Sequence, residues 1–88
     1  MKPMNRETAV EYQWTLRDIE NEQNDIPYAI KEAKKDGFSY EDTMMCLCDD
    51  LWADLDERLE NDYLKELVGC LHIDMHEIAE RLMADYWN

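Results

Sequence analysis

The side chains best suited to hold a metal ion are three cysteines and two histidines: Cys46, Cys48, Cys70, His72 and His76. Zinc requires four thiolate or imidazole ligands, commonly paired at spacings such as Cys-x-x-Cys or His-x-x-x-His. Cys46 and Cys48 project about 200° apart on a helix, so one helix cannot direct both thiols to the same ion. We therefore expect no metal and no other cofactor. We interpret the thiols as reduced, because an odd number of cysteines cannot form a closed disulfide framework.

No combination of residues predicts an enzyme. His72 and His76 are four residues apart, but Asp74 between them is a predicted helix N-cap, which breaks the helical spacing. Acid–base or nucleophilic catalysis needs a base beside a nucleophile, or two carboxylates in contrasting environments within a pocket. The sequence places no cysteine beside either histidine, and it lacks the D-x-D-x-D-G pattern of a calcium loop. We expect a non-enzymatic protein.

The most distinctive stretch is residues 49–63, DDLWADLDERLENDY, in which a single arginine stands among many carboxylates. On a helix these carboxylates form two rows, an Asp50 row of Asp50, Asp54 and Glu57 and an Asp49 row of Asp49, Asp56 and Glu60. Together the rows place carboxylates about every 5–6 Å along the surface, which is similar to the separation of phosphates along a nucleic-acid strand. The rows are either the solvated face of an ordinary helix or a surface that pairs with Lys and Arg of a partner. Trp52, between them, is either core or anchor.

The charge of the chain favours a basic partner. Its 88 residues carry a net charge of −13, beyond the magnitude of roughly 2–8 typical of small soluble domains. Residues 41–88 hold fourteen acidic and three basic residues, a net charge of −11. This excess argues against direct binding of DNA or RNA, which requires clustered Lys and Arg, and against anionic membranes. No apolar run approaches the roughly 20 residues of a membrane span, and residues 1–10 lack a signal-peptide core, so we expect a cytoplasmic protein.

The carboxylates must be positioned by helices, because two glycines and two prolines leave little turn chemistry for hairpins, and the apolar residues recur at helical spacing. We predict an all-α fold: a compact bundle of four or five short helices in one domain, residues 1–88. The first helix begins after Asn5 and ends within residues 21–24. Pro27 lies in the first turn of the second, which follows Asp25 and ends at Gly37 in a Schellman motif.

The third helix begins at a capping box formed by Ser39 and Asp42 and carries the acidic rows. Asn61 and Asp62 allow a break before a short helix over residues 63–71. Asp74 and Glu77 form the capping pair of the last helix, with Ile73 and Ile78 as its hydrophobic staple. The predicted inward positions follow the helical period: Ala9, Tyr12, Leu16 and Ile19; Ile26, Ile30 and Ala33; Met44, Leu47, Cys48, Leu51, Trp52, Leu55 and Leu59; Ile78, Leu82 and Tyr86. Trp14 and Trp87 fall off these lines and are either interface anchors or closures of the core ends.

In size, charge and helical character, with runs such as residues 49–60, the chain resembles the small acidic helical proteins of phages and other mobile elements, which include DNA mimics and anti-CRISPR proteins. The resemblance carries no family motif and assigns no role to any residue. It implies an inhibitor that blocks the nucleic-acid-binding surface of a basic protein or complex, in the host cytoplasm if a phage encodes it. Our leading hypothesis for the partner-binding residues is Asp49, Asp50, Trp52, Asp54, Asp56, Glu57 and Glu60.

The alternative is a small helical adaptor or regulatory protein that docks through an apolar groove or by self-association, with its acidity serving only solubility. A homodimer that joins two acidic faces into one longer track is also open. Salt separates the hypotheses, because ionic capture weakens as screening rises, whereas apolar docking changes little.

Overall fold

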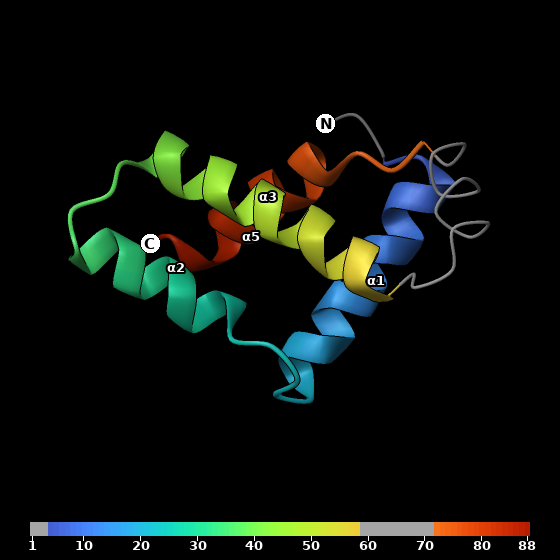
Figure 1. Cartoon of the computed structure of the whole chain (residues 1–88), viewed down its shortest axis with the longest axis horizontal. Helices are drawn as coiled ribbons and strands as arrows, with labels where there is room; N and C mark the ends of the chain where they lie inside the picture. The colour runs from blue at the N-terminus through green and yellow to red at the C-terminus, as the bar shows by residue number, and fades with distance from the viewer. Residues whose placement is uncertain (1–3, 59–71) are drawn as a thin grey trace.

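Every element that the structure describes is a helix. The computed structural model describes residues 4–58 and 72–88, which form α1 (Arg6–Glu20), α2 (Ile26–Lys35), α3 (Tyr40–Arg58) and α5 (Met75–Tyr86) (Figure 1). The predicted all-α bundle of four or five short helices is confirmed. The break expected at Asn61 and Asp62 and the helix expected over residues 63–71 lie outside the described residues.

Three of the predicted N-caps are formed by side chains. Asn5 Oδ1 accepts a hydrogen bond of 2.8 Å from a backbone N–H in the first turn of α1. The backbone N–H of Asp42 donates to Ser39 Oγ at 3.1 Å, and the backbone N–H of Glu77 donates to Asp74 Oδ1 at 3.0 Å. Each bond satisfies a donor that the helix itself leaves unpaired, which contributes about 1 kcal/mol. These local bonds set the starts of α1, α3 and α5.

α2 begins where the sequence predicts, with Pro27 in its first turn. Asp25 occupies the N-cap position, but its side chain makes no capping hydrogen bond. Asn24 takes this role, because the backbone N–H of Ile26 donates to Asn24 Oδ1 at 3.2 Å. The start of α2 is therefore fixed by the residue before the predicted cap.

Gly37 ends α2 in a left-handed conformation, with φ +91°. Its N–H donates to the carbonyl of Lys34 at 3.1 Å, and the N–H of Phe38 donates to the carbonyl of Ala33 at 3.0 Å. This pair of bonds is the predicted Schellman motif, in which the residue after the C-cap takes a positive φ that a Cβ would oppose. The chain reverses here, so α3 lies beside α2.

α5 is the central helix of the described fold, because it contacts α1, α2 and α3. Figure 1 shows α3 crossing it, with α2 at the left of the view and α1 at the right. The buried apolar cluster consists of residues from three helices: Ile30 of α2, Leu47, Leu51 and Leu55 of α3, and Met75, Ile78, Ala79, Leu82 and Met83 of α5. All five α5 members are at most 1% exposed. One face of α3 therefore packs against this cluster.

α1 contacts the core through polar as well as apolar side chains. The predicted positions Tyr12, Leu16 and Ile19 are half-buried against the apolar cluster. The most buried side chains of α1 are instead Thr8 and Thr15, together with Glu11. Thr8 Oγ1 donates to a backbone carbonyl at 3.2 Å and accepts from a backbone N–H at 2.9 Å, both in the segment before α5. Its burial is tolerated because the hydroxyl is fully hydrogen-bonded.

Candidate functional site

α3 has one buried side and one solvent side. Leu47, Leu51 and Leu55, spaced four residues apart, are 6–7% exposed and contact the apolar cluster. Met44 and Cys48 are half-buried beside them, as predicted. The remaining surface of the helix is available for the acidic rows.

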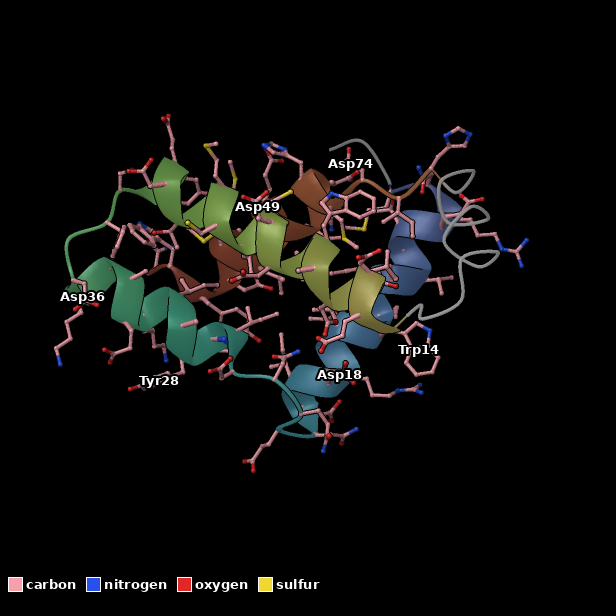
Figure 2. All side chains as sticks on the ribbon, viewed as in Figure 1. Trp14, Asp18, Tyr28, Asp36, Asp49 and Asp74 are labelled. Atoms are coloured by element: carbon pink, nitrogen blue, oxygen red, sulfur yellow. The ribbon has the colours of Figure 1, made fainter. Side chains whose placement is uncertain are left out.

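All five described carboxylates of the predicted site are exposed, and Glu60 lies outside the described residues. Asp49 projects from α3 in Figure 2. Asp50 and Glu57 are seven residues apart and therefore lie within about 20° of each other around the helix axis. Asp54 and Asp56 also interact with other groups in the chain. The side chains of Asp49, Asp50 and Glu57 form no hydrogen bond or salt bridge with the described residues.

Trp52 is 42% exposed, although the sequence placed it on the apolar stripe. Its position is one residue beyond Leu51, which turns it by about 100° toward solvent. It lies one turn from both Asp49 and Asp56, so its ring is the apolar part of an otherwise acidic surface. Of the two alternatives left open by the sequence, the exposed fraction favours the anchor.

The potential around α3 acts on the neighbouring thiol. Burial raises the pKa of the Cys48 thiol, and the carboxylates of Asp49 and Asp74 raise it further, because both effects disfavour the thiolate. Glu41 and Asp42 lie in the first turn of α3, where the helix dipole favours negative charge. The two acidic rows continue toward the opposite end, where the dipole disfavours it.

The cysteines and histidines do not converge in the described part of the chain. Cys46 is exposed, Cys48 is half-buried and both are free thiols, while Cys70 lies outside the described residues. His72 precedes α5 and His76 lies in its first turn, with Nδ1 3.5 Å from Glu80 Oε1. Within residues 4–58 and 72–88, no three His, Cys, Asp or Glu side chains form a group that could hold a metal ion.

A small apolar cavity lies between α2 and α3, next to the Asp50 row. Its volume is about 220 Å³, and Ala33, Phe38, Cys46 and Asp50 are among its lining residues. Phe38 is 53% exposed at the turn between the two helices. Sequence reasoning missed this cavity, although the small residues on both facing helices were a signal that the helices would leave space.

A second surface hollow, of about 350 Å³, lies on the outside of α1 and is lined by Arg6, Val10, Trp14 and Arg17 among others. Val10 and Trp14 are each 50% exposed, and Figure 2 shows Trp14 on the outside of the helix. The Arg17 guanidinium carbon is 5.2 Å from the Trp14 ring centroid, within the range of a cation–π contact. Trp14 is thus exposed, as its position off the inward line allowed.

Trp87 has the opposite role. Its ring is half-buried against the apolar cluster and meets the Tyr40 ring edge-on, with centroids 5.6 Å apart. Lys34 Nζ lies 5.3 Å from the same ring centroid and donates a 2.9 Å hydrogen bond to the Trp87 carbonyl. These contacts join α2, α3 and the end of α5, so Trp87 closes one end of the core and is not a free anchor.

These features describe a class: a small, acidic, all-helical protein that presents two rows of carboxylates and an exposed tryptophan on one helix. No protein-family model, no curated protein and no solved structure matches the chain. Among the described helices, none has both the length and the apolar character needed to cross a membrane.

Proposed function

We propose that this chain is a non-enzymatic binding protein whose α3 carboxylates block the nucleic-acid-binding surface of a basic protein or complex. The observation that carries the proposal is the exposure of Asp49, Asp50 and Glu57 without a cationic partner among the described residues. Like charges at helical spacing destabilise a helix by roughly 0.2–0.5 kcal/mol per pair, so the rows oppose folding. A function in binding accounts for an arrangement that folding does not favour.

The rows can act as a substitute for a phosphate backbone. Carboxylates spaced about 5–6 Å apart along a rigid helix offer Lys and Arg of a nucleic-acid-binding groove a regular series of anions. The long-range field of a chain with net charge −13 accelerates the encounter with a basic partner. Trp52 adds an exposed aromatic ring within the acidic surface, of the kind that contributes most to interface energies.

Such an inhibitor acts as the acidic phage-encoded proteins of DNA-mimic and anti-CRISPR type do, by occupying a surface without modifying it. Its place of action is the cytoplasm, the host's if a phage encodes it, where nucleic-acid-binding complexes are available. We expect it to bind its partner in a fixed ratio and to compete directly with DNA or RNA.

The test is charge reversal of α3 with a matched control. The α3 variant carries Asp49→Lys, Asp50→Lys and Glu57→Lys. The control carries Glu20→Lys in α1, Asp36→Lys at the C-cap of α2 and Glu80→Lys in α5, all at exposed positions. Both variants change the net charge equally. Each protein is added at low salt to purified basic nucleic-acid-binding proteins that are preloaded with a fluorescent DNA duplex, and circular dichroism checks the fold.

We expect the wild-type chain and the control to displace duplex from a responsive partner at similar concentrations. The α3 variant should require at least about tenfold more protein, because three attractive contacts become repulsive. Displacement should also weaken as salt rises, since the Debye length falls from about 10 Å at 0.1 M to about 3 Å at 1 M. Equal displacement by the two variants, or no displacement by the wild type, contradicts the proposal.

The second candidate function is an adaptor that docks through an apolar surface, and the hollow on α1 favours it. Val10 and Trp14 are both half-exposed there, one helical turn apart, and line the same hollow. This candidate requires binding that survives high salt and is lost in Trp14→Ala. Binding that is lost in the α3 variant and retained in Trp14→Ala supports the first function over the second.

A further inference from the structure

The cavity between α2 and α3 opens at one end of the Asp50 row. Its walls come from Ala29 and Ala33 on α2 and from Cys46 and Leu47 on α3, with Phe38 from the turn between them. Small side chains at Ala29, Ala33 and Cys46 lie beside the larger ones of Ile30 and Leu47. The lining of the cavity is largely apolar.

Asp50 belongs to both the cavity and the acidic row. Cys46, Asp50 and Glu57 lie on the same side of α3, at positions that recur every three or four residues. At 1.5 Å per residue, the distance along the axis from Cys46 to Glu57 is about 16 Å. A ligand that follows this side of α3 meets the apolar cavity first and then the carboxylates.

The size and polarity of the cavity select the kind of group that fits. Its volume of about 220 Å³ is below the roughly 300–1,000 Å³ of pockets for small molecules and cofactors. Thr43, which also lines it, uses its hydroxyl proton in a 2.8 Å hydrogen bond to the Ser39 carbonyl. The cavity thus suits one inserted apolar side chain better than a polar metabolite.

We propose that this cavity receives a large apolar side chain of the protein partner, one that stands beside Lys or Arg residues whose cations pair with Asp50 and Glu57. The proposal rests on the proposed function and specifies the partner segment for it. Charge complementarity argues for this occupant. An apolar group without an adjacent cation would remove water from the Asp50 carboxylate, and no ionic contact would offset the cost of that desolvation. A second copy of the chain is disfavoured, since each copy carries a net charge of −13.

The test uses two short fluorescent peptides that differ in one residue. The first has a leucine followed by three arginines, and the second has serine in place of the leucine. Ala29→Leu places a larger side chain in the cavity lining, keeps a strong helix former at this position and leaves the charge unchanged. Tyr28→Leu is the matched control, because Tyr28 is 64% exposed on the same helix and does not line the cavity.

We expect the leucine peptide to have about tenfold higher affinity than the serine peptide, both for the wild type and for Tyr28→Leu. This ratio is the gain in affinity from burying one leucine side chain. In Ala29→Leu the two peptides should bind equally. If the ratio of affinities is the same in all three proteins, the cavity does not receive the apolar side chain and the inference is wrong. Circular dichroism of each variant confirms that the comparison is made between folded proteins.

A charge variant separates this inference from the function on which it rests. Asp50→Asn with Glu57→Gln should weaken both peptides several-fold and keep their ratio, because it removes only the ionic contacts. If this variant binds both peptides as tightly as the wild type, the acidic surface is not a binding surface and the proposed function fails. The leucine-to-serine ratio still reports on the cavity in that case.

Cys46 reports where the peptide binds. The leucine peptide should slow the alkylation of Cys46 by N-ethylmaleimide, measured by mass spectrometry, because this exposed thiol lines the cavity. Cys48, which is half-buried beside the core stripe, provides the internal control. If bound peptide leaves the alkylation of Cys46 unchanged, the proposal is wrong. It is also wrong if Cys46 becomes protected as the protein concentration rises without peptide, because the occupant would then be a second copy of the chain.

Discussion

Thr8 is the residue whose loss should most clearly weaken the attachment of α1 to α5. Its side chain is 0% exposed, and its Oγ1 accepts from the Asp74 N–H at 2.9 Å and donates to the His72 carbonyl at 3.2 Å. Thr8→Val keeps the shape but removes both bonds. The His72 carbonyl still accepts from Asn5 Nδ2 at 2.6 Å, so the Asp74 N–H is the group left without a partner.

An unsatisfied buried donor costs about 1–3 kcal/mol, and this donor is only partly buried, so we expect a loss of about 1–2 kcal/mol in the free energy of unfolding. With a urea m-value of roughly 1–3 kcal/mol/M, the unfolding midpoint should fall by about 1 M. Circular dichroism at increasing urea measures this shift directly.

Thr15→Val on the same helix is the matched control. Thr15 is also buried, but its hydroxyl donates only to the Glu11 carbonyl, one turn earlier in α1, at 3.0 Å. That carbonyl keeps its regular helical hydrogen bond, so Thr15→Val should change the stability by less than about 0.5 kcal/mol. If both substitutions have the same effect, or if Thr8→Val has none, the hydrogen bonds of Thr8 do not hold α1 to the start of α5.

Three further outcomes are expected. Asp50→Asn and Glu57→Gln should each raise the free energy of unfolding by roughly 0.2–0.5 kcal/mol, because each relieves a like-charge pair on α3; a loss of stability in urea would contradict the repulsion. Gly37→Ala should lower the thermal midpoint by about 4–8 °C, because a residue with a Cβ is strained at φ +91° even though no atom lies within 4 Å of the added Cβ. A midpoint within about 1 °C of the wild type would show that the stability of α2 does not depend on this turn. The pKa of Cys48 is raised in the folded chain, so the unfolded chain loses the thiol proton at lower pH. The free energy of unfolding should therefore decline as pH rises from the ordinary thiol pKa upward. Cys48→Ala should remove this part of the decline, as measured by urea titrations at several pH values.

Much of the candidate site follows from the sequence because its determinants are local. An exposed carboxylate on α3 needs only the helical period, which places Leu51 and Leu55 inward and Asp50 and Glu57 outward. The cavity between α2 and α3 could not be predicted from the sequence in this way. It depends on which residues of α2 meet α3 across the turn at Gly37, and such a pairing is fixed by the angle and distance between two helices.

The three tryptophans show the same division. Trp14 and Trp87 fall off the predicted inward lines, whereas Trp52 was predicted to lie on the apolar stripe of α3. Trp14 and Trp52 remain exposed, whereas Trp87 packs against the core and against Tyr40. Their different burial depends on whether the end of another helix lies nearby, and the local sequence does not determine that.

The sequence alone determined where α1, α3 and α5 begin, where α2 ends, which face of α3 is apolar, and that its opposite face is acidic. These properties depend on hydrogen bonds between residues at most five positions apart and on the helical period. Only the tertiary structure decided that Thr8 ties α1 to the segment before α5, that Trp87 closes the core, and that a cavity adjoins Asp50. These features join residues far apart in the chain, so they exist only once the helices are packed against one another.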